Sequence, residues 1–208
     1  MRNHSTCPRC GGPLHEPSVW SSAWQCNLHG QVQPLRPAFR PSKEGLDGVL
    51  RSATVPVWLP WPLPPGWPVT GFVAAGDERS GSCGCAVALT GPNPVGGPGE
   101  MLIISEQPGV GLGARFAGLD GPDPGRDFTA GSPDASVQFG NHEFPLWHVE
   151  APERAAFVGE IMASWLWLVL WPDTAGTLLM ESLTLRDLRD PGQDLDLPYG
   201  AMSPHLPG

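Results

Sequence analysis

The sequence lacks an apolar run long enough to cross a lipid bilayer. Its longest run lies between Glu160 and Pro172 and holds 11 residues, whereas a membrane-spanning helix needs about 20. The opening stretch, MRNHSTCPRC, also lacks the apolar core of a secretory signal peptide. We therefore expect a cytoplasmic protein without a membrane segment, in a reducing compartment that keeps thiols available for metal.

Familiar catalytic motifs are missing as well. The chain has no G-x-x-x-x-G-K phosphate loop, no nucleophile elbow and no Ser-His-Asp motif. The stretch NHEFPLWHVE holds His142, Glu143, His148 and Glu150, but their spacing is not the H-E-x-x-H of zinc proteases. We interpret them as surface or hydrogen-bonded side chains, with a metal or general-base role as the alternative. Whether the protein is an enzyme stays open, and these absences weigh against it.

Charged residues are few, at 16% of the chain, and unevenly spread. Residues 1–43 hold five basic side chains and one acidic one, whereas the remaining chain holds seven basic and twenty acidic ones. Nucleic-acid binding depends on many phosphate contacts, and five dispersed cations beside an acidic body offer few. Binding of nucleic acid through the N-terminal region is therefore an alternative that the charge distribution does not favour.

Cysteine is scarce, with five residues in 208, yet three cysteines and a histidine form two close pairs. CPRCGG holds Cys7 and Cys10, and WQCNLHG holds Cys26 and His29, giving the pattern C-x2-C-x15-C-x2-H of a zinc ribbon. Four protein ligands fill the shell of Zn²⁺, whereas a catalytic zinc keeps one position open for water. We predict a zinc ribbon over residues 1–34 with a structural ion. A redox C-x-x-C pair is the alternative, but it leaves His29 unexplained.

Proline and glycine, by contrast, are abundant, and they divide the chain after the ribbon. Residues 35–54 are predicted to form a proline-rich linker and a short amphipathic helix capped by Ser42. The stretch VPVWLPWPLPPGWP follows, with six prolines from Pro56 to Pro68 and the tryptophans Trp58, Trp61 and Trp67. It is either a strap that buries its tryptophans, which we favour because exposed tryptophan clusters are costly, or a docking segment for a protein partner.

Residues 55–200 are predicted to form an α+β body, followed by a C-terminal tail at 201–208. Short apolar runs separated by Gly/Pro/Asp clusters predict a mainly antiparallel β-sheet with one or two helices and long Gly/Pro-rich loops. In SWLWLVLW, the tryptophans and Val169 would share one face of a central strand and Leu166, Leu168 and Leu170 the other. Periodicity alone leaves open whether residues 159–171 are strand or helix.

Two further patterns have competing interpretations. In GVGLGA, Gly109, Gly111 and Ala114 fit the G-x-G-x-x-A dinucleotide fingerprint, but loop-like residues follow where a second βα unit is needed. We interpret the stretch as a tight packing turn, with a ligand pocket near Gly109–Ala114 as the alternative. Cys83 and Cys85 alternate in a predicted strand and would point to one side. There they could bind a second metal or form a redox pair, but we favour small apolar residues that pack in the core.

Several stretches together carry a resemblance that runs nearly end to end. They are CPRCGG, WSSAWQC, VPVWLPWPLP, GDERSG, GVGLGARFAGL, PLWHV, WLWLVLWP and LTLRDLRD. In this order they resemble an actinobacterial family of unknown activity that begins with a zinc ribbon. The resemblance implies a soluble cytosolic protein and matches the four ligands position by position. Some relatives carry a phosphotransacetylase label, but no motif here can receive the residues of those larger α/β enzymes.

Two hypotheses of function follow. The first is a binding or adaptor protein in which the ribbon, Trp58 or Trp61 recognises a protein partner. The second is a ligand-binding or enzymatic body with a pocket near Gly109–Ala114, to which Arg115, His142 or His148 would contribute polar groups. Convergence of Arg115 and His148 on one deep pocket would favour the second hypothesis.

Overall fold

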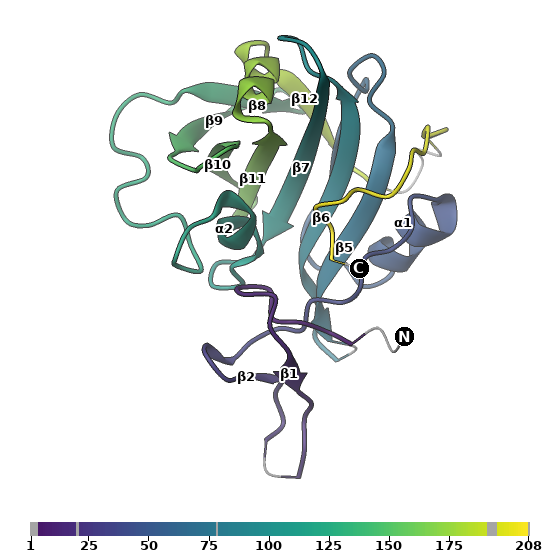
Figure 1. The fold of residues 1–208 in the computed structure, drawn as a ribbon, viewed down its shortest axis with the longest axis vertical. Coiled ribbons are helices and arrows are strands. Elements are labelled where there is room, and N and C mark those ends of the chain that lie inside the picture. Colours follow the sequence, from purple (N-terminus) through teal and green to yellow (C-terminus); the bar gives the residue numbers. More distant parts are fainter. Residues whose placement is uncertain (1–3, 20, 78, 191–194, 208) are drawn as a thin grey trace.

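A computed structural model of the chain describes residues 4–19, 21–77, 79–190 and 195–207. Within these ranges the chain forms a small N-terminal sheet, a large sheet and a few short helices (Figure 1). The strands of the small sheet are β1 (Leu14–His15), β2 (Gln25–Cys26) and β3 (Gly30–Gln31). Those of the large sheet are β4 (Trp58–Pro60), β5 (Val69–Asp77), β6 (Gly81–Pro92), β7 (Pro98–Glu106), β8 (Ala135–Phe139), β9 (His142–Val149), β10 (Ala155–Ile161), β11 (Ser164–Trp171) and β12 (Leu183–Asp187). The helices are α1 (Lys43–Leu50), α2 (Leu112–Ala117) and the 3-10 helix η1 (Asp173–Met180).

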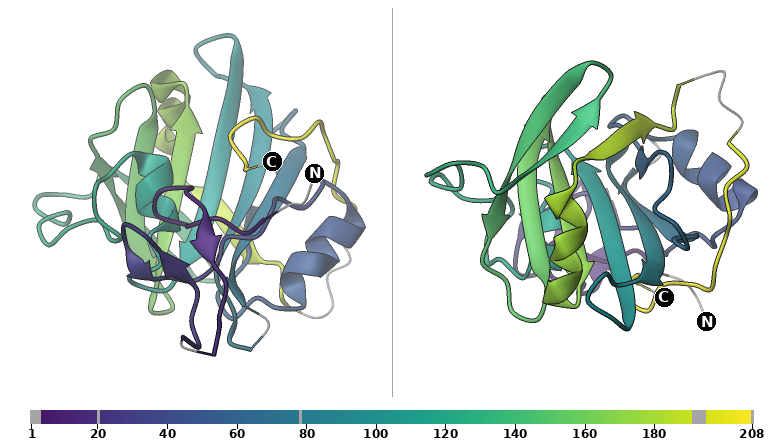
Figure 2. Two further views of the ribbon diagram at one scale, coloured as in Figure 1. Left: turned by 60° about the horizontal axis from the view of Figure 1, so that its bottom comes forward. Right: turned by 90° about the horizontal axis from the view of Figure 1, so that it is seen from above.

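The large sheet has the order β4-β12-β8-β9-β10-β11-β7-β6-β5. Its neighbouring strands run antiparallel, apart from the parallel pair β8 and β12. The sheet is strongly curved (Figure 2), and β4 contacts β6 and β7 across the concave side. The predicted class, an α+β protein with a mainly antiparallel body and few helices, is confirmed.

Strand β11 lies at the centre of this sheet and is buried on both faces. Leu166, Leu168 and Leu170 pack into one hydrophobic cluster, while Trp167 and Val169 pack into the cluster on the other side. The alternation expected from the sequence is therefore present, and the segment is strand rather than helix. Residues 155–161 form a separate strand, β10. The chain reverses between β10 and β11 at residues 162–163, which both have positive φ.

The tryptophans of the proline-rich strap are mostly inside the protein. Trp58 is 1% exposed and Trp67 is 2% exposed, and Trp61 packs partly buried against the same cluster. The strap interpretation is thus confirmed for Trp58 and Trp67. The prediction that Trp58 meets a partner is wrong, because β4 pairs with β12 and places that ring in the core.

Two other local predictions fail for reasons of strand geometry. Cys83 and Cys85 belong to hydrophobic clusters on opposite faces of the sheet, not to one side. The pairing of β5 with β6 shifts register between Ala75 and Gly76, and the resulting bulge interrupts the two-residue alternation at Cys83. The run GTLLM at residues 176–180 is mostly apolar and by itself predicts the start of a strand, but these residues lie in the 3-10 helix η1.

The outer edge of β5 is covered rather than open. Residues 34–39, which we call the connector, lie along it, with N–H···O bonds from Arg36 to Ala74 (3.0 Å) and from Phe39 to Phe72 (2.8 Å). The C-terminal segment adds a bond from Ser203 N to Thr70 O (2.9 Å). Helix α1 follows the connector, and its predicted cap is present, since Ser42 Oγ accepts from Gly45 N. An edge covered in this way does not recruit another strand.

Candidate metal centre

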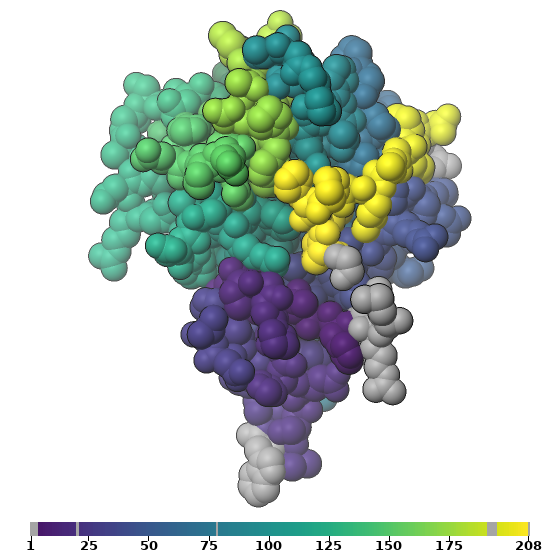
Figure 3. Space-filling view, in the orientation of Figure 1, coloured from purple at the N-terminus to yellow at the C-terminus, as the bar shows by residue number. Residues whose placement is uncertain are grey.

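The N-terminal ribbon forms a narrow extension beneath the large sheet (Figures 1 and 3). Its own core is very small, with Cys7, Cys26 and Val32 buried and Leu14 packed against them. A unit of this size buries too little apolar surface to be stable alone, which is why such units usually depend on a metal or disulfides. The ribbon contains no disulfide, since its three cysteines are free thiols.

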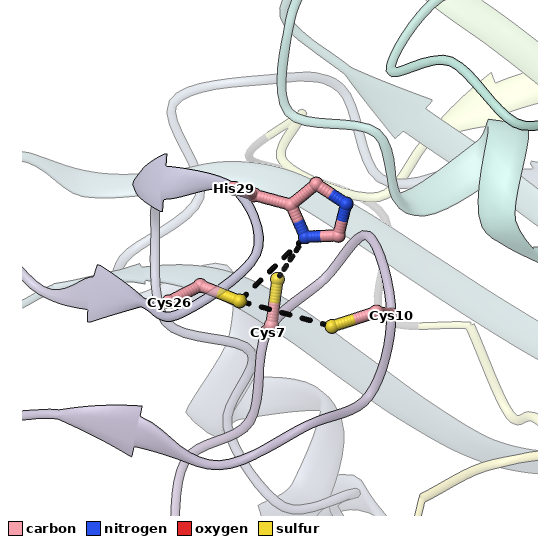
Figure 4. Close-up of side chains that lie close together, drawn as sticks. All are labelled: Cys7, Cys10, Cys26 and His29. Carbon is pink, nitrogen blue, oxygen red and sulfur yellow. Dashed lines mark hydrogen bonds between the residues drawn. The ribbon is translucent and has the colours of Figure 1, made fainter.

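The four predicted ligands come together at the top of the ribbon. Cys7 and Cys10 lie on a tight turn closed by bonds from Gly11 N to Cys7 O and from Cys7 N to Gly12 O, both 2.8 Å long. Cys26 ends β2, and His29 lies in the turn that leads to β3. Their side chains point toward one another (Figure 4), and the four ligand atoms all lie within 4.8 Å of one another.

The separations between these atoms match those of a tetrahedral zinc shell. Cys10 Sγ and Cys26 Sγ are 3.8 Å apart, and His29 Nδ1 is 3.6 Å from the Sγ atoms of Cys7 and Cys26. With Zn–S and Zn–N bonds of about 2.3 and 2.05 Å, tetrahedral angles place S···S at about 3.8 Å and S···N at about 3.6 Å. The arrangement therefore has the dimensions that one Zn²⁺ at its centre requires.

The thiols differ in their electrostatic surroundings. Burial raises the pKa of Cys7 to about 11, against the lowering effect of the backbone N–H groups of Cys10 and Arg9. Burial also acts to raise the pKa of Cys26, but hydrogen bonds from the N–H groups of Leu28 and His29 outweigh it and bring that pKa to about 6. A divalent cation among the sulfurs favours the thiolate form of each.

Two arginines join the metal centre to the body. Arg9, which lies between the first two cysteines, donates from Nη2 to Gly109 O and from Nε to Val110 O (3.4 Å). From the other side, Arg115 in α2 donates from Nη1 to Cys7 O (3.4 Å). A Cys3His zinc site carries a charge of about −1, so cations on both sides of it are electrostatically favourable.

The close approach of Arg115 explains the glycine after the first cysteine pair. Gly11 has φ +70°, and a Cβ at this position would lie 2.6 Å from Arg115 Nη2. A side chain would therefore be strained by its backbone and would also push the guanidinium away from the ribbon. The turn and its contact with the body both need glycine here.

The dinucleotide fingerprint is not a nucleotide site. Gly111 caps α2, but the N–H groups at that helix start are already bonded to Glu106, with Leu112 N to Oε2 at 2.6 Å and Gly113 N to Oε1 at 2.9 Å. A pyrophosphate would have to displace this carboxylate. No parallel βα unit follows either, because α2 leads through a long loop to β8. No motif in the sequence indicated that Glu106 would accept hydrogen bonds from the start of this helix.

Other predicted polar residues do not converge. Arg115 lies against the cysteine cluster. His148 instead lines a pocket with Asp134 and Phe157, beside β9, β10 and η1. His142 and Glu143 are exposed at the β8–β9 turn, and Glu150 is exposed at the end of β9. In the described part of the chain, the cysteine–histidine cluster is the one group of three or more His, Cys, Asp or Glu ligand atoms close enough to hold a metal.

A cavity of about 430 Å³ does lie near Gly109. It is bounded by Gln107 and Gly109 of the body and by Arg9 and Gln31 of the ribbon, and Cys83 also lines it. Burial raises the pKa of the Cys83 thiol to about 11. The thiol is therefore protonated and unreactive at neutral pH.

Comparison with known proteins places the chain in a family. One family model matches residues 1–206. The chain belongs to DUF6758, a family of unknown function. No curated protein and no solved structure matches this DUF6758 member. None of the described helices is long and apolar enough to cross a membrane. The membership agrees with the resemblance to a family of unknown activity, and it brings no activity with it.

Proposed function

We propose that this DUF6758 protein is a binding module of the adaptor type, held in shape by a structural Zn²⁺. The metal is bound by Cys7, Cys10, Cys26 and His29. Three thiolates and one imidazole are the ligands that zinc prefers in structural sites, and their separations fit a tetrahedral shell. Four protein ligands leave no position for water or substrate, so the ion supplies folding energy rather than catalysis.

The observation that carries the adaptor role is the exposure of large apolar side chains on this metal-held ribbon. Val19, near the tip of the β1–β2 hairpin, is 94% exposed, and Leu28, between two ligands, is 79% exposed. The ribbon protrudes from the body (Figure 3) and is fixed to it by Arg9 and Arg115. Two apolar side chains on a small, rigid projection suit contact with a protein surface.

Nucleic-acid binding by the ribbon has less support. Arg9 donates to the backbone oxygens of Gly109 and Val110 in the body. This one of the five cations in residues 1–43 is therefore engaged within the protein, which leaves fewer charges for the many phosphates of a nucleic acid.

The adaptor role is tested by quantitative affinity capture from cell lysate with the full-length, zinc-loaded protein. The ribbon variant replaces Val19 and Leu28 with Ser, and the matched control replaces the exposed Val95 and Met180 of the body with Ser. We expect the ribbon variant to lose the proteins that the wild type enriches, while the control retains them. Equal capture by the two variants, or no reproducible enrichment by the wild type, would refute the adaptor role.

A further inference from the structure

A second cavity lies between the ribbon and the body, away from the metal ligands. Its volume is about 680 Å³, which is within the range of sites for small organic ligands. The ribbon contributes Ser22 and Trp24, the connector contributes Arg36 and Phe39, and the β5–β6 turn contributes Asp77 and Arg79. Neither the metal centre nor the exposed apolar side chains of the ribbon account for this cavity.

The cavity brings together two guanidinium groups. Arg36 is half-buried, and its Nε donates to Gly76 O at 3.3 Å. Its terminal nitrogens have no hydrogen-bond partner among the described residues. Arg79 is exposed, and its backbone N donates to Asp77 Oδ1 at 2.9 Å. Guanidinium groups with unused N–H donors bind carboxylate and phosphate oxygens in pairs.

Asp77, the acidic residue of the described lining, already accepts hydrogen bonds from within the β5–β6 turn. Asp77 Oδ1 also accepts from Ser80 N and Ser80 Oγ, each at 2.8 Å. These hydrogen bonds from Ser80 lower the pKa of Asp77. The carboxylate thus orders the turn that carries Arg79, and the described lining has two positive side chains against this one negative side chain.

The rest of the lining is aromatic and rich in proline. Trp24 and Phe39 are half-buried and line the cavity together with three prolines. Flat apolar walls of this kind favour a flat apolar ligand group, and indole rings stack on other rings. If the bound anion had no ring, these apolar side chains would stay exposed to solvent.

We propose that this cavity binds a small organic anion that carries an aromatic ring. Arg36 and Arg79 hold the carboxylate or phosphate group, and the ring packs against Trp24. The charge of the whole chain is −9, but salt screens charges beyond about 8 Å, so the two guanidinium groups dominate within the cavity.

Binding at this cavity depends on the proposed metal centre, because Trp24 lies two residues before Cys26. Without metal, the ribbon side of the cavity loses its fixed position, while the connector and the β5–β6 turn remain on the body. Ligand affinity is therefore expected to follow metal content.

The test uses calorimetric titration of the full-length protein at about 0.15 M ionic strength with three probes: phenyl phosphate, inorganic phosphate and phenol. We expect saturable binding of phenyl phosphate, about tenfold tighter than that of inorganic phosphate because only the former fills the aromatic wall. Arg79→Gln should weaken the binding of phenyl phosphate about tenfold. The matched surface variant Arg126→Gln should bind it as tightly as the wild type does. Trp24→Leu should remove the advantage of phenyl phosphate over phosphate, and Trp24→Phe should largely restore it.

Absence of saturable binding by phenyl phosphate overturns the proposal, as does equal binding by Arg79→Gln and Arg126→Gln. Zinc content measured on the same samples separates this proposal from the metal centre. If the protein carries zinc but binds no probe, the proposed ligand of the cavity is contradicted and the metal centre is not. If the protein is metal-free and still binds phenyl phosphate, the metal centre and the dependence of the cavity on it are both contradicted, whereas the proposed ligand of the cavity is not.

Discussion

Arg115 Nη1 lies 3.4 Å from the carbonyl oxygen of Cys7, a residue 108 positions earlier in the chain. This contact joins α2 of the body to the Cys7–Cys10 turn. It is reinforced from the opposite direction by Arg9, whose guanidinium donates to the backbone just before α2. The candidate metal centre and the packing of the ribbon on the body are therefore one structural unit.

Cys26→Ser should remove the metal and loosen residues 4–34 while the body stays folded. Cys26 is 6% exposed at the centre of the ribbon core, and the ribbon has little else to hold it. Hydrogen exchange should show fast exchange in the ribbon and wild-type protection in β6, β7 and β11. Cys83→Ser, which changes a cysteine outside the cluster, serves as the control and should keep one metal per chain. Equal metal content in the two variants would contradict the ligand assignment.

Arg115→Gln should retain the metal but loosen the ribbon from the body. The half-buried guanidinium makes a charge-assisted bond to Cys7 O, and such bonds contribute about 1.5–3 kcal/mol. Hydrogen exchange is expected to accelerate at residues 7–12 and 109–115. Arg126→Gln is the matched control, since that side chain is exposed. Loss of the metal in Arg115→Gln, or unchanged exchange at both segments, would argue against this docking role.

Glu106 should make the stability of the protein pH-dependent near neutrality. Burial raises its pKa from the ordinary 4.5 to about 7, although the N–H groups of Leu112 and Gly113 oppose the shift. The folded protein therefore holds this proton more tightly than the unfolded chain does. The resulting stabilisation is full below about pH 4.5 and is lost as the pH rises to about 7.

The measurement is the free energy of urea unfolding for wild type and Glu106→Gln between pH 5 and 8. Because the glutamine has no proton to lose, the wild type should lose stability relative to the variant as the pH rises, by an amount on the order of 3 kcal/mol. Parallel pH curves for the two proteins would show that this carboxyl has an ordinary pKa in the folded state.

Gly113→Ala should destabilise the body by overpacking. A Cβ at this position would lie 2.1 Å from Cδ1 of the buried Trp167, and forced repacking of a core costs about 1–3 kcal/mol. Gly121→Ala is the control, since its nearest neighbour would be 3.5 Å away. Urea unfolding of both variants tests the contact between α2 and β11. Similar midpoints for the two variants would contradict it.

The sequence was most informative where the signal is local. The closeness of Cys7, Cys10, Cys26 and His29 was predictable because metal-binding turns use fixed short spacings, and the two buried faces of β11 were predictable because Leu166, Leu168 and Leu170 alternate with larger residues. The cap at Ser42 was equally local. Each of these depends on residues within about ten positions of one another.

The sequence was least informative where distant segments meet. Burial of Trp58 was expected, but the strand that pairs with its segment is β12, about 130 residues away, and no local pattern identifies it. The separation of Cys83 from Cys85 depends on a bulge against β5. The sequence pointed to Arg115 only as a polar group for a pocket and did not single out Arg9, whereas the fold places the two arginines on either side of the cysteines. No short-range pattern encodes such contacts.

Zinc X-ray absorption on the purified full-length protein tests the central claim most directly. Coordination by Cys7, Cys10, Cys26 and His29 predicts three sulfur scatterers at about 2.3 Å and one nitrogen at about 2.0 Å. A shell dominated by oxygen and nitrogen, or a metal-free protein whose residues 4–34 are nevertheless ordered, would contradict the account.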